Sequence, residues 1–261
     1  MSLAIETKDL SDILISAEET KKGVRPLTEL APNLTIDEAY RIQLATIEKK
    51  ISEGQVISGK KIGLTSLAMQ QLLGVDEPDY GHLLHSMEIC NGGTVSRDSL
   101  LQPKVEAEIA FVLKKDLIGP NVTVADVLEA TDYIQPAIEI VDSRVENWKI
   151  KLCDTVADNA SSGLYVLGEK KLALDEVDLK EIKMELYRNG VLENEGVGKA
   201  ALGNPAYCVA WLANKLTTYG IHLKANEVIL SGALSAAVNA NKGDVFFAKF
   251  DSLGEVEVRF D

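Results

Sequence analysis

The sequence has little cysteine, little histidine and little positive charge. Its three cysteines, Cys90, Cys153 and Cys208, lie far apart and form no CxxC pair, which argues against a disulfide framework or a zinc site. A histidine-based metal site is not expected either, because no third ligand accompanies His82 and His85. The cysteines are interpreted as small buried hydrophobic residues, and a reducing, cytoplasmic setting is expected.

Long apolar runs and basic clusters are missing too. No stretch of about 18 apolar residues is present, so no membrane span is expected. The first residues show no basic region followed by an apolar one, so no signal peptide is expected. A formal net charge of −13 argues against nucleic acid and anionic membranes as partners. Neither a GxSxG nucleophile motif nor a glycine-rich phosphate loop occurs in the 261 residues.

Hydrophobic periodicity predicts helices first and strands afterwards. Residues 10–17 repeat at helical spacing, and Thr35 with Glu38 forms a capping-box pattern that opens a second helix. The apolar stripe of this helix is predicted to be Ile36, Tyr40, Leu44, Ile47 and Ile51. The sequence predicts an α+β protein with an N-terminal helical region at 1–55 and a β-rich catalytic domain at 56–261, together forming one compact unit.

Further elements are expected within residues 56–261. Three segments read as strands: 56–64, 103–113 and 134–142. Hairpins are predicted around Asn91-Gly92-Gly93, around Asn189-Gly190 and between 245–250 and 255–260. Helices are predicted over 67–73, from Thr123 to about Tyr133, and from Asn204-Pro205 to Gly220.

Two glutamates lie on one face of the strand over 103–113. Val105, Ala107, Ile109, Phe111 and Leu113 point one way, while Glu106 and Glu108 point the other. Burying a carboxylate without a partner is costly, and two adjacent carboxylates repel each other. A divalent cation such as Mg²⁺ or Mn²⁺ is the simplest partner for their oxygens. The alternative is an exposed edge strand with solvated glutamates.

A third glutamate and a lysine extend this candidate site. Glu139 also lies in an apolar strand, so Glu106, Glu108 and Glu139 are predicted to bind one divalent cation; separate surface ion pairs are the alternative. Lys61, between Gly59 and Gly63, is the natural positive partner, with a pKa expected to be lowered by burial near a metal. Lys60 should face the other way, as a solvated lysine on an edge strand.

Asp79 is a further candidate acid. It lies in a stretch dense in turn-forming residues, just before Tyr80 and Gly81. A carboxylate in a loop usually braces the turn, so the spacing leaves both a structural and a catalytic role open.

Several motifs in series resemble one family. The 2-oxopent-4-enoate (2-hydroxypenta-2,4-dienoate) hydratases and the related 4-oxalocrotonate decarboxylases belong to the fumarylacetoacetate hydrolase superfamily. The chain looks like them from about residue 35 to residue 260. The resemblance is carried by GKKIGLTS at 59–66, PDYG at 78–81, PKVEAEIA at 103–110, PAIEIVDSR at 136–144, DTVADNAS at 154–161 and SGAL at 231–234.

The resemblance implies a fold, a cofactor and partners. It implies a β-roll core surrounded by helices, with Mg²⁺ or Mn²⁺ bound by Glu106, Glu108 and Glu139. It also implies a small 2-oxo or 2-hydroxydienoic acid substrate in the meta-cleavage degradation of aromatic compounds. A homo-oligomer is implied as well, and association with a related pathway enzyme is left open.

Hydratase is the preferred activity and decarboxylase the alternative. The resembling hydratases tend to carry aspartate where this chain has Asp79, whereas the decarboxylases tend to carry an apolar residue. A hydratase needs a proton carrier away from the metal, which Asp79 could provide together with Lys61. Ser161, Gly232, Ala233 and Leu234 are predicted to line the substrate pocket. An acylpyruvate hydrolase and a non-enzymatic partner subunit are the less favoured readings.

Overall fold

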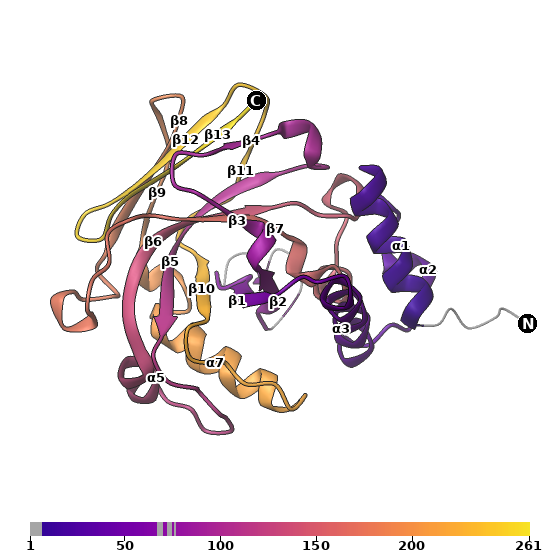
Figure 1. The fold of residues 1–261 in the computed structure, drawn as a ribbon, viewed down its shortest axis with the longest axis horizontal. Helices are drawn as coiled ribbons and strands as arrows, with labels where there is room; N and C mark the ends of the chain where they lie inside the picture. The colour runs from indigo at the N-terminus through magenta and orange to yellow at the C-terminus, as the bar shows by residue number, and fades with distance from the viewer. Residues whose placement is uncertain (1–6, 67–69, 72–74, 76) are drawn as a thin grey trace, which may run out of the picture.

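The computed structural model describes residues 7–66, 70–71, 75 and 77–261. The N-terminal helices gather at one side of a strongly curved β body, and α5 and α7 lie below it in the view of Figure 1. The named helices are α1 (Thr7–Thr20), α2 (Leu27–Leu30), α3 (Ile36–Ser52), α5 (Val124–Ala130), α6 (Leu152–Ala157) and α7 (Pro205–Thr217). None of the helices in these described ranges is long and apolar enough to cross a membrane.

Eight strands form the larger sheet, in the order β2-β1-β10-β5-β6-β7-β3, with β11 paired to β5. β1 runs parallel to β10 and β7 runs parallel to β3, whereas the pairs β10–β5, β5–β6 and β6–β7 are antiparallel. The bounds are β1 (Ile57–Gly63), β2 (Asp79–Leu84), β3 (Glu88–Ile89), β5 (Lys104–Leu113), β6 (Thr131–Val141), β7 (Ser162–Leu167), β10 (Val228–Ala233) and β11 (Val238–Asn239).

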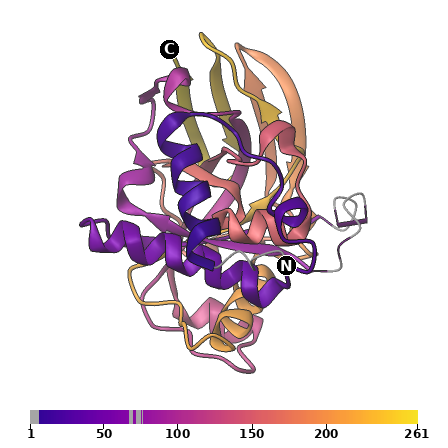
Figure 2. The ribbon, with the colours of Figure 1, turned by 90° about the vertical axis from the view of Figure 1, so that its right-hand side faces the viewer.

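A second, five-stranded sheet has the order β4-β13-β12-β8-β9 and forms the upper part of the molecule in Figures 1 and 2. The predicted hairpin around Asn189-Gly190 joins β8 and β9, and both residues have positive φ, as a type I′ turn requires. The bounds are β4 (Thr94–Val95), β8 (Lys183–Arg188), β9 (Val191–Val197), β12 (Val245–Phe250) and β13 (Gly254–Phe260).

The predicted alternation of β5 separates two environments. Its first face packs into the large hydrophobic core through Val105, Ala107, Ile109, Phe111 and Leu113. The opposite face carries Glu106 and Glu108, and then Ala110, which joins a smaller buried cluster with Ala137 and Leu230. β5 lies in the middle of its sheet and not at an edge, and on this second face Glu108 is buried and Glu106 half-buried.

Most predicted elements are confirmed, with small shifts at the ends. Thr35 and Glu38 make both bonds of a capping box, and Asn204 caps α7 with Pro205 in its first turn. The helix predicted to reach Tyr133 ends instead at Ala130, because Thr131 already pairs with Leu113 as part of β6.

Two local expectations have other outcomes. The turn at Asn91-Gly92-Gly93 forms, but it does not join a hairpin: β3 pairs with β7 and β4 pairs with β13, in different sheets. The short helix predicted over 67–73 falls largely on residues 67–69 and 72–74, which lie outside the described residues.

Candidate active site

Three carboxylates from two neighbouring strands meet at one point. Glu106 on β5 lies directly opposite Glu139 on β6, and Glu108 is two residues further along β5 on the same face. One oxygen of each can be chosen so that all three lie within 4.8 Å of one another. The strands therefore bring together the three residues that the sequence predicted as one group.

This cluster fits a divalent cation. Oε1 of Glu108 and both oxygens of Glu139 are buried without a hydrogen bond, although carboxylate oxygens rarely stay so. Burial and the neighbouring Glu139 raise the pKa of Glu106 to about 7, and burial raises the pKa values of Glu108 and Glu139 as well. Two buried acids and a half-buried one, whose oxygens lie close together, are the donor set that hard dications prefer.

Lys61 on β1 reaches the same point from the neighbouring side of the sheet. Its Nζ lies 3.2 Å from Oε1 of Glu139, and its side chain is almost completely buried. Burial by itself would lower the pKa of Lys61, but Glu139 and the carboxylates of Asp79, Glu106 and Glu108 outweigh burial and raise it. This direction is opposite to the lowered value expected from the sequence.

Asp79 lies beside Lys61 and is the first residue of β2, rather than a loop residue. Its partner in β1 is Gly63, where an added Cβ would lie 2.2 Å from Oδ1 of Asp79 and 3.1 Å from Nζ of Lys61. The missing side chain of Gly63 thus leaves the space in which the two candidate catalytic groups meet. Oδ2 of Asp79 accepts a hydrogen bond of 2.7 Å from Thr155, while Oδ1 is buried without one.

The segment from Gly232 to Leu234 supports the acidic cluster. The backbone N–H of Gly232 donates to Oε2 of Glu108 at 2.7 Å, which leaves Oε1 free. At its φ of +105°, an added Cβ would lie 2.3 Å from Oγ1 of Thr65, so glycine is required there. Ala233 pairs with Glu108 across the strands, and the side chain of Leu234 packs into the large core.

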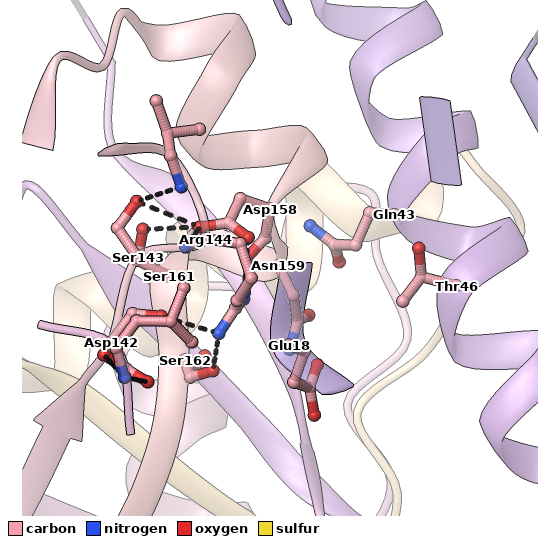
Figure 3. A network of polar contacts seen from close by, with 12 residues as sticks. Glu18, Gln43, Thr46, Asp142, Ser143, Arg144, Asp158, Asn159, Ser161 and Ser162 are labelled. Carbon is pink, nitrogen blue, oxygen red and sulfur yellow. Dashed lines mark hydrogen bonds and ion pairs between the residues drawn. The ribbon is translucent and has the colours of Figure 1, made fainter. Parts of the chain in front are cut away.

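Ser161 lies in a different set of contacts. Its hydroxyl donates to Oδ2 of Asp158 at 3.0 Å, and Asp158 forms a buried ion pair with Arg144 (Figure 3). Residues 159–161 all have positive φ, an uncommon left-handed turn for residues other than glycine. The hydroxyl of Ser161 is thus already engaged in bracing this turn.

Lys60 corrects one prediction. It faces away from Lys61, as alternation requires, but it is buried and not solvated, and β1 lies between β2 and β10 rather than at an edge. Its Nζ lies 2.7 Å from both carboxylate oxygens of Glu227. Lys60 is therefore one half of a buried ion pair on the outer face of the sheet.

Two residues that the sequence did not identify support this site: Thr155 bonds to Asp79, and Gln43 bonds to the backbone of the next residue, Tyr80. Thr155 appears only as part of a motif, and a threonine in a short helix gives no signal of its own. Gln43 lies on α3, three residues after Tyr40 and four before Ile47, and it is fully buried. A glutamine at a buried position of an amphipathic helix is the signal that could have identified it.

The fold and the acidic cluster define a class of protein. Residues 77–261 match the C-terminal domain of the fumarylacetoacetate hydrolases, and the chain belongs to that family. It is 45% identical to a 2-hydroxyhexa-2,4-dienoate hydratase of Comamonas testosteroni, over 95% of this chain and 94% of the other. It is 44% identical to a 2-keto-4-pentenoate hydratase of Paraburkholderia xenovorans, over 98% and 95%.

A solved structure is similar over nearly the whole length. It is a 4-oxalocrotonate decarboxylase from Pseudomonas putida G7, complexed with magnesium and adipate. The TM-score is 0.95 and the sequence identity 37%, with 98% of this chain and 97% of that chain covered. The N-terminal helices, which lie outside the family match at 77–261, are thus shared with this decarboxylase.

Proposed function

We propose that this chain is a divalent-metal-dependent hydratase that adds water to 2-hydroxypenta-2,4-dienoate, giving 4-hydroxy-2-oxopentanoate. The observation that carries the proposal is the largely buried cluster of Glu106, Glu108 and Glu139 with Lys61 and Asp79 beside it. The similarity to two hydratases over nearly the whole chain supports the reaction type.

The three glutamates would bind the cation, with Mg²⁺ or Mn²⁺ favoured because all the donors are carboxylate oxygens. When bound, the cation supplies positive charge that stabilises the enolate form of a 2-oxo acid. The magnesium complex of the similar decarboxylase supports a dication in this fold.

Lys61 and Asp79 would move the protons. The dienol must lose the proton of its 2-hydroxyl group and gain one at C5, which yields an α,β-unsaturated ketone. Water then adds at C4, and a proton is delivered to C3. Oδ1 of Asp79 is a buried acceptor without a hydrogen bond, and Nζ of Lys61 is a neighbouring donor, so the pair can accept and return these protons.

The substrate would lie against the segment from Gly232 to Leu234 and against Ser161. The backbone N–H of Gly232 already donates to Glu108, so it is not free to bond to the substrate. We therefore propose that this segment contributes the shape of the pocket wall. The hydroxyl of Ser161 donates to Asp158, so Ser161 could meet a substrate only through its remaining acceptor capacity or its backbone. We also propose the homo-oligomer that the family resemblance implies. Mass photometry of the purified protein would measure the number of chains in it.

A 4-oxalocrotonate decarboxylase is the second candidate, favoured by the similarity to the decarboxylase complexed with adipate. The experiment supplies one purified chain and Mg²⁺ or Mn²⁺ with 2-hydroxypentadienoate and 2-oxohex-3-enedioate in parallel. Loss of diene absorbance with the first substrate is expected. Release of CO₂ from the second, with no reaction of the first, would establish the decarboxylase instead. No turnover of either, with metal bound, would indicate a non-catalytic subunit.

A further inference from the structure

Among the described residues, one side chain bonds to the carboxylate of Asp79, and the geometry of this bond decides how the carboxylate points. Thr155, on α6, donates from Oγ1 to Oδ2 at 2.7 Å. The other oxygen, Oδ1, is buried and faces the space left by Gly63, beside Nζ of Lys61. A rotation of the carboxylate out of its present plane would break the bond to Thr155, so the threonine fixes the orientation in which one oxygen faces the space beside Lys61.

Thr155 and Asp79 come from different elements, and one amide joins these elements. Nε2 of Gln43 donates to the backbone oxygen of Tyr80 at 2.9 Å and to that of Val156 at 2.6 Å. Tyr80 follows Asp79 in β2, and Val156 follows Thr155 in α6. Gln43 therefore bonds to the residue that follows Asp79 and to the residue that follows Thr155.

The orientation of this amide is determined by its partners. Both Nε2 protons of Gln43 are used by carbonyl oxygens, so Oε1 must accept, and it lies 3.0 Å from Nδ1 of His82. Burial and Lys60 lower the pKa of His82 to about 3, so the imidazole stays neutral and its Nδ1 carries the proton. All the hydrogen-bonding groups of this fully buried amide are engaged.

A second support holds β2 further along but does not reach Asp79. The side chain of Asn159 accepts from the His82 N–H at 2.7 Å and donates to the His82 carbonyl at 2.9 Å. Figure 3 shows Gln43 on α3 pointing toward the segment that carries Asp158 and Asn159. The contact next to Asp79 itself is the one made by Gln43.

We propose that Thr155 and Gln43 are positioning residues for Asp79: Thr155 orients its carboxylate, and Gln43 sets the separation of the two elements that carry the pair. This inference rests on the proposed function, in which Asp79 carries protons. Neither residue touches the acidic cluster through any contact described above, so metal affinity should not depend on them.

The first test replaces the hydroxyl without changing the shape. Thr155→Val should lower kcat for 2-hydroxypentadienoate about tenfold to a hundredfold, the usual effect of losing a hydrogen bond to a charged group. Its KM and its Mn²⁺ affinity should stay within about threefold. Thr155→Ser keeps the hydroxyl and should restore most of the rate. Thr131→Val, also buried but bonded only to a helix carbonyl, is the matched control with wild-type kcat.

A double-mutant cycle separates positioning from a general loss of structure. If Thr155 acts through Asp79, then Thr155→Val should change kcat less than about threefold in an Asp79→Asn background. An equal loss in both backgrounds would overturn the proposal for Thr155. For Gln43, Gln43→Met should lower kcat in the wild-type background and have little effect beside Asp79→Asn. Thr46→Val, one turn along the same helix face, should leave kcat unchanged.

Crystal structures of the variants test the positioning roles independently of the proposed hydratase activity. In a crystal structure of Thr155→Val, the Asp79 carboxylate should be rotated or displaced from Lys61. In Gln43→Met, the separation of β2 and α6 beside Asp79 should widen. Unchanged positions in both would overturn the positioning roles even if the wild-type chain hydrates the dienoate. If the wild-type chain does not, the proposed function fails while these displacements still report on positioning.

Discussion

Asp79 and Lys61 show that a single residue, here Gly63, can determine the geometry of the candidate site. Both are buried, they come from adjacent antiparallel strands, and the space between them exists because residue 63 has no side chain. The sequence shows Gly63 two residues after Lys61, and a glycine within a strand often marks a close approach. The group that approaches, the carboxylate of Asp79, was visible only once the strand register was known.

Asp79 should separate catalysis from metal binding. Asp79→Asn keeps the shape and an acceptor for Thr155 but removes the base, so kcat for hydration should fall about a hundredfold or more. Asp79→Ala should lose at least as much. Isothermal titration with Mn²⁺ should show affinity within a few-fold of wild type for both variants. Wild-type turnover by either variant would remove Asp79 from the mechanism.

Metal binding should depend on pH in a direction set by the raised pKa values. Glu106, with a pKa of about 7, holds a proton at pH 5.5 that the metal must displace. Affinity for Mn²⁺ should therefore rise between pH 5.5 and 8, with protons released on binding. Calorimetry in buffers of different ionisation enthalpy measures both quantities, and an affinity independent of pH would contradict the assignment of Glu106 as a ligand.

The raised pKa of Glu106 also predicts how the stability of the metal-free protein depends on pH. A carboxyl group whose pKa is raised on folding stabilises the protein fully below its unfolded value, and that contribution is lost as pH rises through the folded value. For Glu106 the loss falls between about 4.5 and 7. Saturating Mn²⁺ should therefore raise Tm more at pH 8 than at pH 5.5, and an equal rise would contradict the linkage.

At the scale of the element, β1 places two consecutive lysines in opposite environments. Lys61 faces the acidic cluster, while Lys60 pairs with Glu227 on the other face, where burial lowers the pKa of Lys60. Strand alternation predicted that the two lysine side chains point in opposite directions. It could not predict that both faces are covered, because this depends on β1 pairing with β10 from the far end of the chain.

Lys60 should matter for stability and not for the metal. Lys60→Met leaves the carboxylate of Glu227 buried without its partner, which should cost about 3–5 kcal/mol of unfolding free energy. Replacing Glu227 by Leu in the same chain should recover much of that loss. Denaturant unfolding measures both, and Lys115→Met, from an exposed ion pair, should show no measurable change. A wild-type free energy for Lys60→Met would show that the pair contributes nothing.

Helix α3 shows the limit of periodicity. The predicted stripe included Leu44 and Ile51, but Ile51 is 43% exposed, and the buried face runs instead through Ala39, Ile42, Gln43 and Thr46. Apolar spacing indicated a helix correctly and placed Tyr40 and Ile47 inside. The polar residues on the buried face are explained by partners on other elements, which no local pattern contains.

For the whole molecule, the N-terminal helices are tied to the β body. Gln43 on α3 bonds to β2 and to α6, and Tyr40 packs its ring against Tyr80 with centroids 5.1 Å apart. We therefore propose that 1–55 and 56–261 are regions of one folding unit and not independent domains.

This proposal predicts that a fragment of residues 56–261 does not fold alone, because it would expose the surface that α3 covers. Circular dichroism and denaturant unfolding would show no cooperative transition for the fragment, and one transition for the full chain. A fragment with a cooperative transition and intact Mn²⁺ binding would instead establish two domains.

The sequence by itself determined the properties that depend on neighbours along the chain. The alternation of 103–113 put Glu106 and Glu108 on one face, the alternation of 134–142 marked Glu139, and the caps at Thr35 and Asn204 placed two helix starts. These features follow from the periods of strand and helix and from local hydrogen bonds, which act over a few residues.

Only the tertiary structure decided which distant residues meet. The register of β5 and β6 sets Glu139 opposite Glu106, the pairing of β1 with β2 sets Asp79 beside Lys61, and α6 supplies Thr155. Strand pairing and helix docking follow from burying the whole apolar surface at once. For that reason, the local pattern could identify the acids but could not show which threonine and glutamine hold one of them in place.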